Sequence, residues 1–370
     1  MKYYIIAGEA SGDLHASNVL KALKTLDSQA DFRCWGGDLM QAAGGYIVKH
    51  YKDLAFMGFI EVIQHLGTIL KNIKFCKEDI LQYQPDVILF VDYPGFNMRM
   101  AKWAKLQGFK TAYYVSPTVW AWKEKRVHHI HKYVDKMMVI LPFEKAYYDK
   151  YGYKVHYVGH PLIEVMEKEL AIPSSLLPEQ GRKTIALLPG SRTQEIKKML
   201  PVILECMQAY PDYDCIIAQA PAQEETLYKS IIGDNKQVRL LKNKTYDILK
   251  IADAAIVTSG TATLETALLG VPQVVVYKTS PTTYRIARHF VKVKYISLVN
   301  LILDKPSVME LIQEDCTVVR LSAALKDILD EGARRQPILA DYKLLWQSLA
   351  HQNKASLEVA HIVSQLAQKK

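Results

Sequence analysis

The sequence lacks the features that place a chain in or across a membrane. Its longest uncharged apolar runs, such as residues 266–277, are about twelve residues long, whereas a helix needs roughly twenty to cross a bilayer. The amino terminus passes from Met1-Lys2 into a short apolar run and then a glycine loop, without the longer apolar segment of a signal peptide. We therefore expect no membrane-spanning segment and a cytoplasmic location.

Cysteine is scarce and scattered. The five thiols, none of them spaced as CxxC, are Cys34, Cys76, Cys206, Cys215 and Cys316. An odd number without close spacing fits reduced thiols rather than a disulfide framework or a zinc cluster.

A strong excess of one charge is also missing. The formal net charge is +9, from 47 basic and 38 acidic residues among 370, and no basic tail is present. This mild excess suits anionic substrates or an anionic membrane surface, whereas no recognised nucleic-acid motif appears. With 49% hydrophobic and 23% charged residues, the composition is that of a globular protein long enough for two domains.

Short apolar runs alternate with amphipathic stretches along the chain. This alternation is typical of βαβ units that build parallel sheets. The predicted strands are residues 3–7, 87–91, 111–115, 136–141, 184–188, 214–218, 254–257 and 273–277. The predicted fold class is α/β, with two successive Rossmann-like domains.

The segment 171–181 separates the two series of strands. It contains two prolines and a glycine, cannot continue a helix and shows no strand alternation, so we predict an interdomain linker. The predicted domains are residues 1–170 and 182–336. Residues 337–370 have a helical pattern with apolar stripes that need a surface to cover.

Three loops that follow predicted strands are rich in small and hydroxyl-bearing residues. Small residues let a ligand approach the backbone, and free amides at a helix start attract anions. The candidate residues are Gly8, Glu9, Ser11 and Gly12 in the first loop, Gly190, Ser191 and Arg192 in the second, and Gly260, Thr261, Thr263 and Glu265 in the third.

The second and third loops have the residues of a phosphate site. Arg192 can form paired hydrogen bonds to a phosphate, and Glu265, one turn inside its helix, can accept from ribose hydroxyls. Two structural alternatives stay open. The first loop lacks the GxGxxG pattern of dinucleotide sites and also fits a plain tight turn, and the third loop also fits a Ser/Thr-rich helix cap without a ligand.

Asp92 directly follows the predicted strand 87–91. A carboxylate at the carboxyl end of a parallel strand faces the ligand-binding edge, where it can act as a general base on a sugar hydroxyl. It can equally cap the next helix or orient the turn. Asp212 and Asp214 form a DxD pattern, but they lie at the wrong end of their strand, so we predict no metal there. The histidines at 128, 129 and 131 lie in a basic run that disfavours a cation.

The stretch 56–75 is apolar over most of a helix circumference. Such a helix can pack wholly inside the protein, or it can dip into lipid headgroups and hold acyl chains. The residues assigned to the second interpretation are Phe56, Met57, Phe59, Ile60, Ile63, Leu66, Ile69 and Leu70.

Five blocks in a fixed order resemble the lipid-A-disaccharide synthase family. They are residues 8–13 (GEASGD), 114–122 (YVSPTVWAW), 158–162 (VGHPL), 188–192 (LPGSR) and 259–265 (SGTATLE). The resemblance covers nearly the whole chain. It implies the GT-B fold, in which two Rossmann-like domains face each other across a cleft, with carboxyl-terminal helices that pack back on an amino-terminal domain and are exchanged in some dimers.

The resemblance also implies an activity. Family members join UDP-2,3-diacylglucosamine to 2,3-diacylglucosamine 1-phosphate (lipid X) and release UDP, as peripheral proteins of the inner membrane. By the same resemblance the domain 1–170 binds the acceptor and lipid, and the domain 182–336 binds the UDP-sugar. We expect inversion at the anomeric carbon, no divalent cation, no cofactor, no nucleic-acid partner and a monomer or an exchanged homodimer.

Residue roles follow from the same resemblance. It implies that Asp92 is the base, Arg192 binds phosphate and Asn300 is the essential asparagine of the donor site, with Glu310 and Gln313 in a following helix. Gly95 is a departure, because many relatives have a second carboxylate there. The alternatives are another enzyme of the same fold that uses UDP-N-acetylglucosamine, such as a peptidoglycan transferase or a 2-epimerase, and a non-catalytic nucleotide-binding membrane adaptor.

Overall fold

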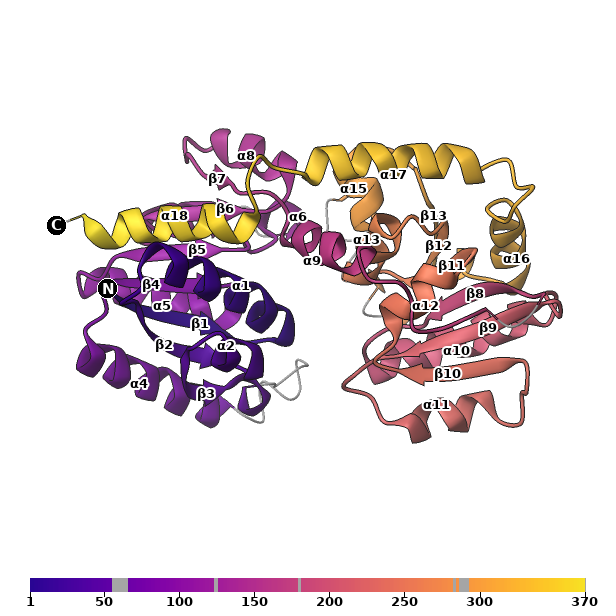
Figure 1. Cartoon of the computed structure of the whole chain (residues 1–370), viewed down its shortest axis with the longest axis horizontal. Coiled ribbons are helices and arrows are strands. Elements are labelled where there is room, and N and C mark those ends of the chain that lie inside the picture. The colour runs from indigo at the N-terminus through magenta and orange to yellow at the C-terminus, as the bar shows by residue number, and fades with distance from the viewer. Residues whose placement is uncertain (55–65, 123–125, 179–180, 282–283, 286–292, 370) are drawn as a thin grey trace. The chain divides into compact units, whose positions relative to one another are not determined.

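The computed structural model describes residues 1–54, 66–122, 126–178, 181–281, 284–285 and 293–369. They form two compact α/β units, shown in Figure 1. Unit 1 comprises Met1–Pro161 and His351–Lys370, and unit 2 comprises Leu162–Ala350. Two Rossmann-like units confirm the predicted fold class.

Unit 1 is built on a seven-stranded parallel sheet. Its strand order is β3-β2-β1-β4-β5-β6-β7, so the order reverses between β1 and β4. The strands are β1 (Lys2–Ala7), β2 (Asp31–Gly36), β3 (Tyr46–His50), β4 (Val87–Val91), β5 (Thr111–Tyr114), β6 (Lys136–Val139) and β7 (His156–Tyr157). Strand β4 and, after the exposed Lys2, strand β1 are buried throughout because helices cover both faces of the sheet.

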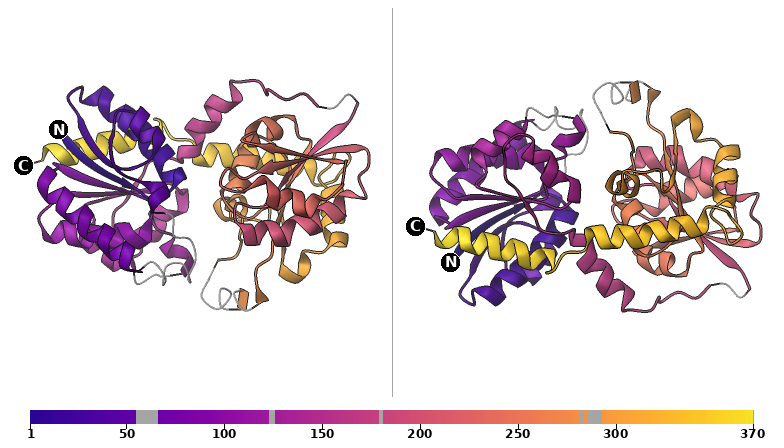
Figure 2. Two further views of the ribbon diagram at one scale, coloured as in Figure 1. Left: turned by 90° about the horizontal axis from the view of Figure 1, so that it is seen from below. Right: turned by 90° about the horizontal axis from the view of Figure 1, so that it is seen from above.

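Alternate residues of each strand enter two different cores of unit 1. Ile5 and Leu89 pack with helices α1 and α18, whereas Ile6 and Phe90 pack with α4, α5, α7 and α8. The helices of this unit are α1 (Ala10–Leu26), α2 (Asp38–Ala42), α4 (Leu66–Tyr83), α5 (Pro94–Leu106), α6 (Val119–Trp122), α7 (Arg126–Tyr133), α8 (Pro142–Asp149) and α18 (Ala355–Gln368), with the 3-10 turn η1 (Tyr51–Asp53). Figure 2 shows helices on both sides of the sheet.

Helix α18 comes from the other end of the chain and lies beside α1 on the sheet (Figure 1). Val359 and Val363 are fully buried there, and Lys110 Nζ donates to the carbonyl of Ala367 at 2.9 Å. The predicted return of a carboxyl-terminal helix to the amino-terminal domain is therefore observed for α18.

Unit 2 has a six-stranded parallel sheet in the order β10-β9-β8-β11-β12-β13. Its strands are β8 (Lys183–Leu188), β9 (Tyr213–Gln219), β10 (Val238–Lys242), β11 (Ala254–Thr258), β12 (Gln273–Tyr277) and β13 (Met309–Ile312). Its helices are α9 (Pro161–Leu170), α10 (Thr193–Met207), α11 (Glu225–Ile232), α12 (Thr245–Ile251), α13 (Thr261–Leu268), α15 (Leu298–Leu303), α16 (Val318–Lys326) and α17 (Arg335–Leu349), with the 3-10 turn η2 (Gln313–Asp315). The first residue of α9, Pro161, still belongs to unit 1.

The unit boundaries differ from the predicted ranges 1–170, 182–336 and 337–370. In α9, Leu162 and Met166 pack into the core of unit 2, so the chain enters this unit before residue 170. Helix α17 also belongs to unit 2, where Tyr342 and Leu345 are buried and Trp346 Nε1 donates to the carbonyl of Leu268 at 3.0 Å. Both helices have an apolar stripe, but the sequence of a stripe does not show whether it packs into the core of unit 1 or of unit 2.

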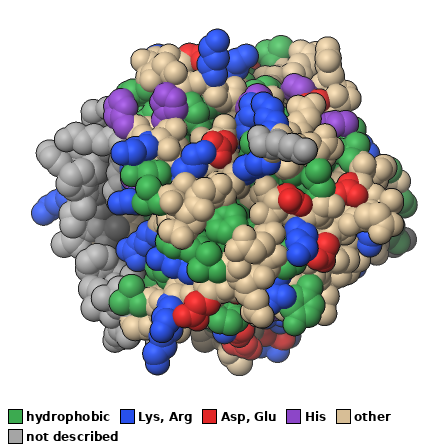
Figure 3. Space-filling view, turned by 90° about the vertical axis from the view of Figure 1, so that its left-hand side faces the viewer, with side chains coloured by type: hydrophobic (Ala, Val, Ile, Leu, Met, Phe, Trp, Pro, Cys, Tyr) green, Lys and Arg blue, Asp and Glu red, His purple; other side chains and the backbone are tan. Residues whose placement is uncertain are grey.

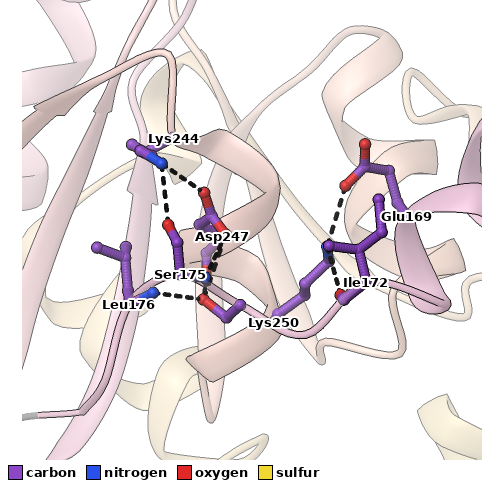
Figure 4. A network of polar contacts seen from close by, with 8 residues as sticks. Glu169, Ile172, Ser175, Leu176, Lys244, Asp247 and Lys250 are labelled. Atoms are coloured by element: carbon purple, nitrogen blue, oxygen red, sulfur yellow. Dashed lines mark hydrogen bonds and ion pairs between the residues drawn. The ribbon is translucent and has the colours of Figure 1, made fainter.

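The predicted linker lies inside unit 2, where polar contacts hold it against α12 (Figure 4). The amide of Ser175 donates to Asp247 Oδ1 at 2.8 Å, and Lys244 Nζ donates to Asp247 Oδ2 at 3.1 Å. Lys250 Nζ donates to Glu169 Oε2 at 3.0 Å. The hydrogen bond from the Ser175 amide lowers the pKa of Asp247 to about 2, and the ammonium group of Lys244 acts in the same direction.

Candidate functional site

The first group of candidate residues meets where the strand order of unit 1 reverses. Ala7 of β1 pairs with Val91 of β4, so the loops that begin at Gly8 and Asp92 leave adjacent strands at the same edge. In doubly wound sheets this edge is where ligands bind. The structure therefore brings Gly8, Glu9 and Asp92 together, as the sequence predicts.

The glycines of the first loop are needed for close packing. A Cβ at Gly8 would lie 2.3 Å from a ring carbon of Tyr93, and one at Gly12 would lie 3.2 Å from Cβ of Ala7. Ser11 is exposed and Glu9 is half-buried. Two of the four predicted residues thus have a structural reason to be small, and Glu9 is the charged group beside Asp92.

Asp92 is held in an uncommon backbone conformation. Its φ is 47°, that of Tyr93 is 50° and that of the β-branched Val115, at the end of the neighbouring strand β5, is 65°. Non-glycine residues in the left-handed region cost about 1 to 3 kcal/mol each and cluster at functional sites. Three such residues at the ends of the adjacent strands β4 and β5 make this edge a candidate functional site.

Hydrogen bonds stabilise this turn. The carbonyl of Asp92 accepts from Asn97 Nδ2 at 2.8 Å and from the Tyr113 hydroxyl at 2.6 Å, while its amide donates to the carbonyl of Tyr114 at 2.9 Å. Asn97 is fully buried in α5 and also donates to the carbonyl of Ile6 at 3.2 Å. These contacts involve only the backbone atoms of Asp92, and its carboxylate accepts from the backbone amide of Tyr93.

The Asp92 carboxyl group has a raised pKa. Burial, and then the negative charge of Glu9, raise the pKa of Asp92 to about 6. A carboxylate with a pKa near neutrality is a stronger base than an ordinary one and is still ionised at pH 7. The N-cap of α5 is Tyr93, without a side-chain capping bond, so the structure does not support the capping alternative for Asp92.

The segment that contains the Trp120 and Trp122 motif follows β5, the next strand along this edge. Trp120 Nε1 donates to Glu144 Oε1 at 3.3 Å, and Ser116 Oγ lies 2.7 Å from the Tyr148 hydroxyl. Burial raises the pKa of Glu144 to about 7. These contacts fix the segment against α8 beside the Asp92 turn.

The second group of candidate residues meets at the corresponding edge of unit 2. Leu188 of β8 pairs with Val257 of β11, so the loops at 190–192 and 259–261 leave adjacent strands where this strand order reverses. The two predicted phosphate loops are therefore neighbours.

Glu195 organises the first of these loops, a role that the sequence analysis missed. Its Oε2 accepts from the amides of Ser191 at 3.1 Å and Arg192 at 3.3 Å, and its Oε1 accepts from Arg192 Nη1 at 3.2 Å. Gly190 has a φ of +118°, and a Cβ there would lie 2.7 Å from Cβ of Glu195. A glutamate three residues after the helix cap accepts from the cap amide as in a capping box, but the cap is Arg192 rather than Ser or Thr, so the usual sequence signature is absent.

The second loop leads into α13. Gly260 is the N-cap without a side-chain capping bond, and Thr261 is exposed. Thr263 is buried and donates through Oγ1 to the carbonyl of Gly260 at 2.8 Å, so its hydroxyl has a structural partner. Glu265 accepts from the Tyr246 hydroxyl at 2.7 Å, and burial raises its pKa.

Glu310 does not lie in a helix, which corrects the prediction for that residue, whereas Gln313 lies in a single 3-10 turn. Glu310 is in strand β13, and Gln313 begins η2. The Glu310 carboxylate accepts from the amides of Ile296 at 3.0 Å and Ser297 at 2.9 Å and from Asn300 Nδ2 at 2.9 Å. The family resemblance implied this helix, and the short edge strand β13 occupies residues 309–312 instead.

Asn300 is also engaged inside unit 2. It is 1% exposed, and its amide group exchanges hydrogen bonds of 2.9 Å with the backbone of Val308. Gln313 Oε1 accepts from the amide of Thr279 at 2.9 Å. Asn300, Glu310 and Gln313 thus fix the turns at this edge, and their contact with a nucleotide stays a prediction.

The described residues include no group of three or more histidine, cysteine or acidic side chains placed to hold a metal ion. In the DxD pattern, Asp214 is 2% exposed and forms an ion pair with Arg239 at 2.7 Å, at the amino end of β9. Metal independence itself stays a prediction.

Most of the predicted lipid-facing helix lies outside the described residues. This applies to Phe56, Met57, Phe59, Ile60 and Ile63. Leu66 begins α4, Ile69 is half-buried and Leu70 is 55% exposed. No helix among the described ranges combines the length and apolarity needed to span a bilayer.

Comparison with known proteins decides the family. The model of the family described as lipid-A-disaccharide synthetase matches residues 3–363. The chain is 37% identical over 374 residues to the lipid-A-disaccharide synthase of Geobacter metallireducens. The aligned region covers 99% of this chain and 97% of that protein. The chain belongs to the lipid-A-disaccharide synthase family. The synthase of Syntrophus aciditrophicus is 39% identical over 343 residues, which is 90% of each chain.

Solved structures agree with this family in fold. UDP-GlcNAc 2-epimerase from Neisseria meningitidis, bound to UDP-GlcNAc, matches with a TM-score of 0.65 over 99% of both chains at 11% identity. Identity this low supports the shared two-domain fold alone. The synthase family consists of hexosyltransferases that form the lipid A disaccharide, and the alternative of a 2-epimerase therefore has only the fold in its favour.

Proposed function

We propose that this chain transfers the 2,3-diacylglucosaminyl group of UDP-2,3-diacylglucosamine to the 6-hydroxyl of 2,3-diacylglucosamine 1-phosphate and releases UDP. The observation that carries the proposal is the Asp92 carboxyl group. It lies at the ligand-binding edge of a Rossmann sheet, on a turn held in a costly conformation, with its pKa raised to about 6. Family membership supplies the substrates.

The proposed reaction is a single displacement. Asp92 takes the proton of the acceptor hydroxyl while that oxygen bonds to the anomeric carbon, and the bond to UDP breaks with its electron pair on the diphosphate. Arg192 and the amides at the start of α13 in unit 2 stabilise the departing charge. One displacement without an enzyme nucleophile inverts the anomeric carbon and requires no cofactor.

We also propose peripheral contact with the cytoplasmic face of the inner membrane, because both substrates are acylated. Leu70 and Phe75 of α4 are 55% and 44% exposed, next to the exposed Lys71 and Lys74. An apolar and basic helix face of this kind suits an anionic lipid surface. The chain acts as a monomer or as a homodimer that exchanges carboxyl-terminal helices.

A donor-selectivity assay tests the proposed function. The chain is incubated with lipid X and either UDP-2,3-diacylglucosamine or UDP-N-acetylglucosamine, with and without a chelator, and the products are detected by mass. We expect disaccharide 1-phosphate and UDP from the acylated donor alone, at equal rates with and without chelator. Turnover of the non-acylated donor at a comparable rate would contradict the substrate assignment, and loss of activity with chelator would contradict the metal-free mechanism.

A further inference from the structure

Unit 1 contains a cavity of about 520 Å³ that the proposed reaction does not use. It is open to solvent, lies beside the edge strand β7 and is lined by residues of α8 and α18. Its lining residues are Lys145, Val155, His156, Tyr157, His351, Glu358, His361, Ile362 and Gln365. Three imidazoles, one ammonium group and one carboxylate therefore face the same space.

Helix α18 supplies a continuous wall of this cavity. Glu358, His361 and Gln365 are three and four positions apart, so they project from one face of the helix. His351, which precedes the helix, packs edge-on against the ring of Tyr157 at 5.9 Å. The polar groups thus come from several elements of one unit, and the cavity does not depend on a single flexible loop.

One ammonium group, that of Lys145, and one carboxylate, that of Glu358, line the cavity, and a second ammonium group, that of Lys136, lies behind His156. Lys136 of β6 places Nζ 3.3 Å from His156 Nε2, and because an ammonium can only donate, that nitrogen accepts and Nδ1 carries the proton. Burial, followed by the charges of Lys136 and Lys145, lowers the pKa of His156. The single carboxylate, Glu358, already accepts from Asn353 Nδ2 at 2.5 Å. Figure 3 shows histidine side chains gathered near lysine and arginine side chains on one face of the molecule.

These features favour an anion over a metal ion. Three histidines and a glutamate suggest a metal site, but they are not placed to hold an ion together within the described part of the chain. Imidazole and ammonium N–H groups are good donors to phosphate oxygens. The volume exceeds that of phosphate alone, and Val155 and Ile362 provide an apolar wall for an attached organic group.

We propose that the cavity between β7, α8 and α18 binds a phosphomonoester, with Lys145 and His361 as its main donors. The shared chemistry fits two sources, a soluble phosphorylated metabolite and the headgroup of a phosphatidic-acid-type lipid. The proposal is independent of the reaction assigned to Asp92 and Arg192.

Calorimetry with two matched probes tests the proposal, on the full chain with excess UDP present to occupy a nucleotide site. The soluble probe is sn-glycerol 3-phosphate, and the lipid probe is vesicles of phosphatidylcholine with or without phosphatidic acid. The test variants are Lys145→Ala and His361→Gln. The control variants, Lys150→Ala and His128→Gln, remove exposed groups that do not line the cavity, at the C-cap of α8 and on α7.

We expect saturable binding of glycerol 3-phosphate with a Kd on the order of 1 mM or tighter, weakened about tenfold in each test variant and unchanged in both controls. If the ligand is a lipid headgroup, the same variants weaken binding to phosphatidic acid vesicles and the soluble probe binds at least tenfold more weakly. Absence of binding by both probes overturns the proposal. Binding that the test and control variants affect equally also overturns it, since it then occurs elsewhere.

Discussion

Replacement of Asp92 by asparagine is expected to lower turnover at pH 8 by about 10²- to 10⁴-fold, the usual contribution of a positioned general base. Asparagine has nearly the same shape but cannot take the proton of the acceptor hydroxyl. The turn of Asp92 is held through backbone atoms by Asn97 and Tyr113, so it should survive the substitution. UDP affinity, measured by calorimetry, should therefore remain unchanged. Normal turnover would remove Asp92 from the base role.

The raised pKa adds a pH dependence. In the wild type, kcat/KM should fall about tenfold per pH unit below about pH 6, because Asp92 becomes protonated there. The control Asp149→Asn, which changes an exposed carboxylate at the end of α8, should retain the wild-type profile and rate. A flat profile between pH 5 and 7, measured with saturating donor, would contradict this environment for Asp92.

Replacement of Asp92 by asparagine should raise the thermal stability of the protein at pH 8 although it lowers turnover. The folded pKa of Asp92, about 6, is above the ordinary aspartate pKa of 3.8, so the unfolded chain loses this proton first as pH rises. The ionised carboxylate thus destabilises the fold at pH 8 and has no such effect below about pH 3.8. Asp92→Asn should melt at a higher temperature than the wild type at pH 8 but not at pH 4. A lower melting temperature at pH 8 would contradict this assignment.

Replacement of Arg192 by alanine has the second largest expected effect. Its guanidinium is 69% exposed and is oriented by Glu195, so it is available to a diphosphate. Loss of such a donor typically costs about 10²- to 10³-fold in rate. Steady-state kinetics should show this loss in Arg192→Ala, whereas the control Arg320→Ala, an exposed arginine of α16, should be unaffected.

Glu195 provides a sharper test of the same site. Glu195→Ala removes the acceptor of two loop amides and of Arg192, and we expect a smaller loss of about tenfold. If Glu195 acts by orienting Arg192, the double variant should be no worse than Arg192→Ala alone. Losses that multiply in the double variant would mean that Glu195 acts independently of the arginine.

The sequence predicts the centre of each sheet better than its edges. Strands β4 and β12 have the predicted bounds because they are continuous apolar runs buried on both faces. All four edge strands, β3, β7, β10 and β13, were missed, since half-exposed edge strands have polar residues that break the run. The inner strand β2 was missed as well, because Arg33 interrupts its apolar run, and the partner of Arg33, Asp79 of α4, is distant in sequence.

The candidate site shows the same division. Asp92, Arg192 and the small residues of the loops are recognisable because they directly follow predicted strands. The contacts that hold them come from distant positions, such as Tyr113, 21 residues from Asp92, and cannot be read from local sequence. Asn97 is closer in sequence, but nothing local distinguishes it from an exposed polar residue of α5.

The anomeric configuration of the product tests the central claim, a single displacement activated by Asp92, most directly. The donor, α-linked to UDP, is labelled with ¹³C at its anomeric carbon, and the disaccharide is examined by NMR after reaction with lipid X. The account predicts a β-linked product formed by the wild type and essentially none formed by Asp92→Asn. An α-linked product would require two displacements or a different leaving path and would contradict it.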